Sequence, residues 1–472
     1  MQSLFDRRSF NREKALIAQQ SVLSSEHQID PFEIIDRSRI SALQMWVLTI
    51  CLLTAMCDGF NTQAPAFIGA PLAKEWGIPF STLGWVFSAA LIGSVLGAAS
   101  MGVLADRVGR KPLVILSLLI FGALTPLCAW AGRADVLIVL RFIAGIGLGG
   151  AMPNLVALAS EYSPARKRTT LVTMTFWGFP MGAALGGLAS SWMIGRFGWR
   201  SLFFLGGAAP LLLAGVTLWM LPESPRFLAL ADDRSAALAR ILASIAGAPL
   251  RSGYCFAVRQ PPRGLGLGTM VKEGLLGGAI LLSVASFASL LLTFLLISWI
   301  PTLMVHSGVK AEDAVFGAVV LNIMGIVGSF VVARVTEGKT YAALALSAGY
   351  TIAALATWAI SLASGSFTGT LLALSAGGFF LIGTQISLLA YTVGYFPAHV
   401  RGAGIGLVQA VGRLGSLVGP ILAGVLLAHG MTRQQVLLVG VVPALLAAGS
   451  FAALSRVARR RSVRSLTLAP ER

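Results

Sequence analysis

The sequence predicts an all-α integral membrane protein whose twelve transmembrane helices form two six-helix pseudo-repeats. Three observations predict this fold class. Hydrophobic residues make up 56% of the 472 residues and charged residues only 12%, whereas a typical soluble domain has about 25% charged residues. Twelve apolar runs long enough to cross a bilayer succeed one another along the chain. Several residues of the first half recur in the second half at one constant offset.

The apolar runs fall into two groups of six. Each run has roughly 20 residues or more, the length that a helix needs to cross a hydrocarbon core of about 30 Å. The first group is predicted at residues 42–66, 80–104, 113–132, 136–158, 170–194 and 201–221. The second group is predicted at residues 275–304, 311–333, 340–362, 368–393, 403–428 and 434–456.

This spacing divides the chain into five segments. They are an N-terminal tail (1–41), a first six-helix bundle (42–221), a central loop (222–274), a second bundle (275–456) and a basic C-terminal tail (457–472). About 28 of the 36 Lys and Arg residues lie in the tails, the central loop and the other loops of one side. Basic loops favour the cytoplasm, so both termini and the central loop are expected there. The net charge of +17 therefore reflects topology, and no nucleic-acid partner is expected.

The internal repeat has an offset of 233 residues. Two glycines of the fifth span and three residues just before it recur in and before the eleventh span. The five pairs are Tyr162 and Tyr395, Pro164 and Pro397, Arg168 and Arg401, Gly182 and Gly415, and Gly186 and Gly419. Parallel repeats of this kind occur in secondary transporters, which bind substrate near the bilayer midplane between the repeats.

Signals for enzymatic chemistry are absent from the sequence. The four cysteines match no metal-ligand spacing, and the four histidines fall in tails or at loop edges. The sequence contains neither the phosphate-binding loop GxxxxGK[ST] nor a nucleophile elbow. We expect no enzyme activity, no ATP-driven step, no metal site and no cofactor.

Several segments resemble a known transporter family. The run GVLADRVGRK (Gly102 to Lys111) resembles the signature loop of the major facilitator superfamily. RFIAGIGLGGAMPN (Arg141 to Asn154) and RGAGIGLVQAVGRLGSLVGP (Arg401 to Pro420) resemble the corresponding segments of its aromatic acid:proton symporter family. The resemblance implies the major facilitator fold and proton-coupled uptake of an aromatic or related organic acid by alternating access, with protons as the coupling ion.

One departure from that family bears on coupling. The family typically carries two acids in a DGxD pattern in the first span, and this chain has Asp58 but Asn61 at the second position. An amide can hydrogen bond but does not hold an exchangeable proton as a carboxylate does. Either Asp58 alone couples transport to protons, which we favour, or coupling has been lost.

Ionisable residues inside a span are expensive and are functional candidates by default. Asp58 lies about 15 Å and Arg141 about 8 Å from the outer ends of their spans, at 1.5 Å per residue. We expect them to pair, so that Asp58 carries the coupling proton and Arg141 tunes it. Burial favours the neutral acid while a neighbouring guanidinium favours the carboxylate, so proton occupancy can change with conformation. A purely structural ion pair is the alternative.

Arg413 is the best candidate for binding a substrate anion. It lies about 15 Å into the eleventh span, near the midplane. Its planar guanidinium matches a carboxylate, and no acid is evident at similar depth in the neighbouring spans of the second half. A bond to backbone carbonyls of another helix is the structural alternative.

Further candidates for substrate contact are polar or aromatic residues inside the spans. We name Asn61, Asn154 and Gln385 among the amides and Trp299, Tyr391 and Trp177 among the aromatics. Weaker candidates are Gln63, Asn322, Gln409 and Phe176. Each could instead tie helices together or pack against them.

A gating role is expected for charges at the cytoplasmic ends of the helices. By family analogy Asp106, Arg107 and Arg110 form a charge cluster after the second span, and Glu161 and Arg168 form the matching contact after the fourth. Retention of positive charge for topology is the simpler alternative.

The expected partners are a small organic acid and the lipid bilayer, and we expect a monomer in a bacterial plasma (inner) membrane. A carrier for a sugar, a non-aromatic acid or a drug stays open as an alternative. So does a membrane sensor that binds solute without transporting it.

Overall fold

Twelve long helices dominate the computed structural model, which describes residues 28–230, 234–247, 255–256, 267–336, 341–363, 366–397 and 399–467. Within these residues, twelve helices are long and apolar enough to cross a membrane. All twelve predicted spans are confirmed as helices. Residues 1–27 of the predicted N-terminal tail, and parts of the predicted central loop and C-terminal tail, lie outside the described residues.

The first bundle contains the six helices of the first half. They are α3 (Ala42–Trp76), α4 (Phe80–Val108), α5 (Arg110–Leu127), α6 (Ala134–Tyr162), α7 (Arg168–Phe197) and α8 (Ser201–Met220). A capping box between Ser41 and Gln44 starts α3. Helix α3 continues through Pro65 and Pro71, beyond the predicted end at residue 66. It ends at Trp76, before Gly77, whose φ of 63° is left-handed.

The second bundle repeats this plan. It contains α12 (Leu276–His306), α13 (Ala311–Thr336), α14 (Ala342–Leu362), α15 (Phe367–Gly377), η3 (Gly378–Ile382), α16 (Gly383–Tyr395), α17 (Arg401–Ala428) and α18 (Arg433–Thr467). The three elements α15, η3 and α16 form one continuous span, and η3 is a turn of π-helix within it. The last helix extends beyond its membrane span, which ends at residue 456.

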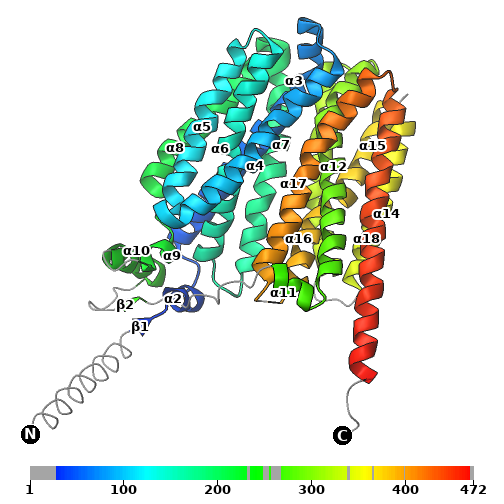
Figure 1. Cartoon of the computed structure of the whole chain (residues 1–472). Helices are drawn as coiled ribbons and strands as arrows, with labels where there is room; N and C mark the ends of the chain where they lie inside the picture. Colours follow the sequence, from blue (N-terminus) through cyan, green and yellow to red (C-terminus); the bar gives the residue numbers. More distant parts are fainter. Residues whose placement is uncertain are drawn as a thin grey trace, which may run out of the picture.

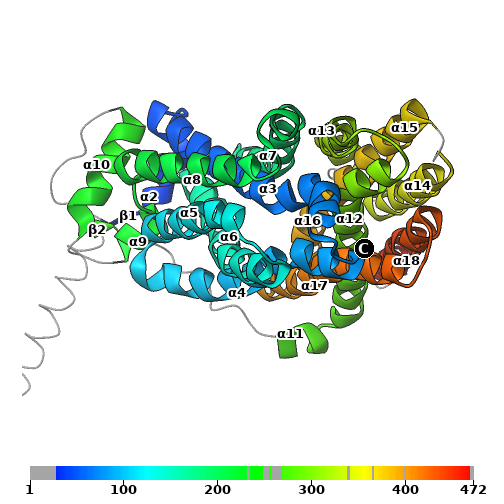
Figure 2. The ribbon, with the colours of Figure 1, turned by 90° about the horizontal axis from the view of Figure 1, so that it is seen from above.

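The two bundles lie side by side, as Figure 2 shows from above. Helices α7 and α13 pack together, as do α4 and α17, and these two pairs make most of the contact between the bundles. Shorter elements gather at one end of the molecule (Figure 1). They are α2 (Pro31–Arg37), α9 (Pro225–Ala229), α10 (Ser235–Ala246), α11 (Leu267–Lys272) and the parallel strands β1 (Gln28–Ile29) and β2 (Cys255–Phe256).

The internal repeat is visible in equivalent contacts. A Cβ atom added at Gly182 would overlap the carbonyl oxygen of Met56, and one added at Gly415 would overlap that of Phe287. Helix α7 therefore crosses α3 as α17 crosses α12, with backbone against backbone. Arg168 Nε donates to the carbonyl oxygen five residues before it at 3.3 Å, and Arg401 Nε does the same at 3.2 Å.

Candidate substrate and coupling site

A cavity of about 540 Å³ lies between the two bundles. Helices α3, α4, α6 and α7 line it from the first half, and α12, α13, α16 and α17 from the second. Its walls are mostly apolar and include the rings of Phe176, Phe179 and Phe294. The volume falls within the range of sites that enclose small organic molecules.

The cavity reaches toward the end of the molecule that carries α2 and α11. Its lining includes Arg168 and Thr169 at the start of α7 and Val393 near the end of α16. At the opposite end α4 packs closely on α17, where Ser88 Oγ donates to the carbonyl oxygen of Leu417 at 3.0 Å. The bundles are therefore closed against each other at that end.

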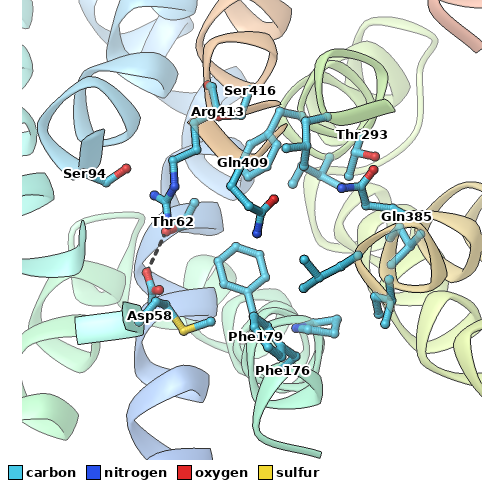
Figure 3. Close-up of a pocket in the computed structure, with 18 of the residues that line it drawn as sticks. Asp58, Thr62, Ser94, Phe176, Phe179, Thr293, Gln385, Gln409, Arg413 and Ser416 are labelled. Carbon is cyan, nitrogen blue, oxygen red and sulfur yellow. Dashed lines mark hydrogen bonds between the residues drawn. The ribbon is translucent and has the colours of Figure 1, made fainter. Parts of the chain in front are cut away.

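Asp58 and Arg413 face each other across one side of the cavity (Figure 3). Asp58 on α3 is only 6% exposed, and Thr62 Oγ1 donates to its Oδ1 at 3.2 Å. Arg413 extends from α17 toward Asp58, yet the described residues show no ion pair between them within 4.0 Å. Arg413 therefore keeps donors available to a ligand in the cavity.

The predicted pair between Asp58 and Arg141 is not formed in this conformation. Arg141 is fully buried, and its Nη2 donates to the backbone oxygen of Asn61 at 2.7 Å. Its Nε and Nη1 have no hydrogen-bond partner among the residues that the structure describes. Residues three apart on a helix differ by about 60° in direction. Asp58 can therefore line the cavity while the Asn61 backbone faces Arg141, and the predicted pair does not form.

The side chain of Asn61 joins α3 to α5 and α8 through hydrogen bonds. Its Nδ2 donates to the carbonyl oxygens of Cys57 at 3.1 Å and Gly206 at 2.8 Å, and its Oδ1 accepts from Thr125 at 3.0 Å. The amide is fully buried and does not line the cavity. Asn61 therefore has no free hydrogen-bonding group for a substrate.

The other amides divide between the cavity and the helix packing. Gln63 and Asn322 exchange two hydrogen bonds of 3.2 and 3.1 Å and so join α3 to α13 at the cavity wall. Gln385 on α16 and Gln409 on α17 line the cavity, as Figure 3 shows. Asn154 instead donates to the carbonyl oxygen one turn before it at 2.8 Å and lies outside the lining.

The three aromatic residues predicted to contact substrate do not line the cavity. Trp299 is fully buried, and its Nε1 donates to the carbonyl oxygen of Pro420 at 2.9 Å at the closed end. Trp177 Nε1 donates to Ser329 Oγ at 3.1 Å, while Tyr391 packs against neighbouring rings of its own half. These helices are apolar on every side, so hydropathy did not distinguish the cavity face from the packed face.

A buried charge cluster joins the ends of three helices near α2. Arg110 at the start of α5 pairs with Glu161 near the end of α6, with side chains 15% and 7% exposed. Ser224, the N-cap of α9, donates to the second oxygen of Glu161. Glu223 accepts from the backbone N–H groups of Arg110 and Lys111 at 2.9 and 3.1 Å, as expected for an acid at a helix N-terminus. The sequence analysis did not identify Glu223, which lies directly before the N-cap of α9.

Two gating predictions differ from the structure. Glu161 does not contact Arg168. The Nη2 of Arg168 instead lies 3.4 Å from Oδ1 of Asp36 on α2. Asp106 and Arg107 are exposed, and among the described residues neither forms an ion pair or hydrogen bond. The last turn of α4 points them to solvent, so they take no part in the cluster in this conformation.

Several lining residues were missed because single hydroxyl and phenyl groups carry little sequence signal inside a span. They are Thr62, Ser94, Phe179, Thr293, Phe294 and Ser416. Spacing could have identified some of them. Thr62 lies four residues after Asp58, and Ser416 lies three residues after Arg413, so each shares a helix face with a candidate ion.

Comparisons with known proteins agree with this architecture. Residues 50–420 match the sequence profile of the Major Facilitator Superfamily. The 4-hydroxybenzoate transporter PcaK of Acinetobacter baylyi is 35% identical over 92% of this chain and 96% of its own length. The gallate transporter of Pseudomonas putida is 34% identical over 85% and 90%.

A solved structure supports the fold independently of sequence. The inward-facing, unoccupied structure of a bacterial homologue of the human lysosomal transporter Spinster superposes with a TM-score of 0.68. The match covers 89% of this chain and 98% of that one at 17% identity. Because the family profile matches residues 50–420 and PcaK is 35% identical over most of the chain, the chain belongs to the major facilitator superfamily.

Proposed function

We propose that this protein is a secondary transporter that carries an aromatic acid into the cell by alternating access. The observation that supports this most directly is the placement of Arg413 and Asp58 together on the wall of a mostly apolar cavity between the two bundles. The relatives named above are transporters of aromatic acids. Twelve spans and bacterial relatives make it a multi-pass protein of the inner membrane.

Arg413 is the proposed carboxylate ligand. A guanidinium offers two parallel N–H groups that match a carboxylate. The phenyl rings of Phe176, Phe179 and Phe294 provide an apolar surface for the substrate ring. The cavity thus combines one cation with aromatic walls, which suits an aromatic acid better than a sugar.

Asp58 is the proposed proton carrier. A substrate carboxylate and ionised Asp58 would compete for the charge of Arg413, because Asp58 and Arg413 line the same cavity. Binding of the anion would therefore be linked to proton uptake by Asp58. A symporter needs this linkage, because substrate and proton must then cross together.

The orientation and assembly belong to the same proposal. The excess of Lys and Arg on the side of the tails supports a cytoplasmic position for α2 and α11. The cavity then opens inward in this conformation, since its lining reaches that end. We propose that the carrier works as a monomer with protons as the coupling ion, and that the cavity between its two bundles is the transport site.

An uncoupled carrier is the second candidate. Asn61 stands in place of the second acid of the family pattern, and the buried guanidinium of Arg141 has no acid partner among the described residues. The site then has one carboxylate fewer to hold a proton than the family's DGxD pattern provides. An uncoupled carrier would let the acid equilibrate across the membrane without accumulating it.

Counterflow tests the proposed substrate class. Proteoliposomes loaded with unlabelled acid should take up labelled 4-hydroxybenzoate, and external aromatic acids should compete with it, while aliphatic acids and sugars should not. Competition by sugars alone would contradict the proposal. Binding without any exchange would instead identify the protein as a sensor.

A further inference from the structure

Gln385 occupies the side of the cavity opposite Asp58 and Arg413. Figure 3 shows its amide directed into the space between the bundles. The residue lies on α16, directly after the π-helical turn η3. A π-turn inserts one residue into a helix and rotates the next part of the helix about its axis, and such turns are frequent at functional sites. The turn thus sets which face of α16 meets the cavity.

One hydroxyl group behind the cavity wall, that of Tyr350, contacts the Gln385 amide, and Ser289 in turn contacts that hydroxyl. Tyr350 on α14 is fully buried and does not line the cavity. Its hydroxyl oxygen lies 3.4 Å from Gln385 Oε1 and 2.9 Å from Oγ of Ser289, a buried residue on α12. The oxygen of the amide is thereby directed toward Tyr350, and the Nε2 group remains to donate into the cavity.

This end of the cavity is polar but carries no charge of its own. The lining cations are Arg413 on the opposite side and Arg168 at the mouth, where Arg168 pairs with Asp36. A second carboxylate on the substrate would find no cation beside Gln385. A neutral substituent with an acceptor oxygen, such as a phenolic hydroxyl, matches a neutral amide donor.

We propose that Gln385, positioned by Tyr350 and Ser289, binds the hydroxyl group of a hydroxylated aromatic acid whose carboxylate is held by Arg413. This assignment rests on the proposed function and adds the residue that selects among aromatic acids. An unsubstituted ring offers no acceptor to the Gln385 donor. We expect hydroxylated acids to bind about three- to tenfold more tightly than unsubstituted ones, the usual effect of one neutral hydrogen bond.

The test measures inhibition constants of 4-hydroxybenzoate and benzoate for the purified carrier. Gln385→Met keeps the length of the side chain and removes the amide, so the preference for 4-hydroxybenzoate should fall to about onefold while benzoate binds as before. Tyr350→Phe removes only the hydroxyl that orients Gln385 and should lower the preference by a smaller factor. Gln409→Met is the matched control, because it removes another cavity amide and should retain the ratio.

The ratio of the two inhibition constants distinguishes a loss of hydroxyl recognition from a loss of folded protein. Unchanged benzoate binding in Gln385→Met shows that the variant is folded. An unchanged ratio, or equal weakening of both acids, would overturn the assignment of Gln385. If the wild-type carrier bound neither acid, the proposed function would fail, and the assignment of Gln385 would fail with it.

Discussion

At the scale of single residues, two buried arginines have different surroundings and therefore different roles. Arg413 faces a cavity and an acid, whereas Arg141 is enclosed and has only one backbone partner. The sequence showed both at plausible depths but could not separate them. The difference arises from which side of each helix meets the other bundle, and only the packing determines that.

Replacing Arg413 tests its proposed role as the anion ligand. We expect Arg413→Ala to weaken binding of 4-hydroxybenzoate by roughly tenfold to a hundredfold, because a hydrogen bond to a charged group contributes about 1.5–3 kcal/mol. Arg413→Lys should recover part of the loss, since it keeps the charge but not the planar fork. Ligand binding measured by calorimetry on purified protein would show this, and equal affinities in all three proteins would exclude Arg413 as the ligand.

Replacing Arg141 tests whether this arginine is an unpaired cation or a member of a structural ion pair. Two of its nitrogens have no partner, so Arg141→Met should leave the free energy of unfolding unchanged or raise it by about 1 kcal/mol. A structural ion pair would predict a loss of about 3–5 kcal/mol on breaking the pair. Thermal unfolding in detergent measures the difference, and a large drop in Tm would refute our description of the site.

At the scale of helices, the charge cluster at Glu161 ties α5, α6 and α9 together. Glu161→Gln removes the ionic partner of Arg110 while keeping the shape of the side chain. We expect the free energy of unfolding to fall by about 1–3 kcal/mol, because a buried donor loses its charged acceptor. Asp106→Asn is the control, since Asp106 is exposed. Equal Tm values for the two variants would contradict the cluster's stabilising role.

Close packing of α7 on α3 depends on glycine at their crossing. Gly182→Ala places a methyl group against the Met56 carbonyl and should cost about 1–3 kcal/mol of stability through overpacking. Gly215→Ala serves as the control, since a Cβ there meets nothing within 4 Å. If both variants unfolded at the same temperature, the crossing would not be as tight as described.

The helices themselves could be predicted from the sequence because each needs only length and hydropathy. Which face of each helix lines the cavity could not be predicted from the sequence. Asn154 and Trp299 were placed in the substrate site because they are polar or aromatic at mid-depth, yet each satisfies its hydrogen bond within the protein. Gln385 was identified correctly as lining the cavity, whereas its support from Tyr350 required the packing of α14 and α12 against α16.

At the scale of the whole molecule, the repeat explains how one cavity serves a transport cycle. Equivalent crossings in the two halves allow each bundle to move as a unit, and the contacts of Ser88 with Leu417 and of Phe87 with Trp299 join the bundles at one end. These contacts must separate for the cavity to open to the other side. The Asp58 and Arg413 side chains belong to different bundles, so this motion changes their distance and can link the proton to the substrate.

The most direct test is accumulation of labelled 4-hydroxybenzoate in proteoliposomes with and without an imposed inward proton gradient. We predict uphill accumulation that collapses with a protonophore in the unsubstituted carrier. In Asp58→Asn accumulation should be lost while exchange of internal for external acid persists, because the cavity and Arg413 remain. Uphill uptake that survives Asp58→Asn, or equilibration that ignores the gradient in both proteins, would contradict proton coupling through Asp58.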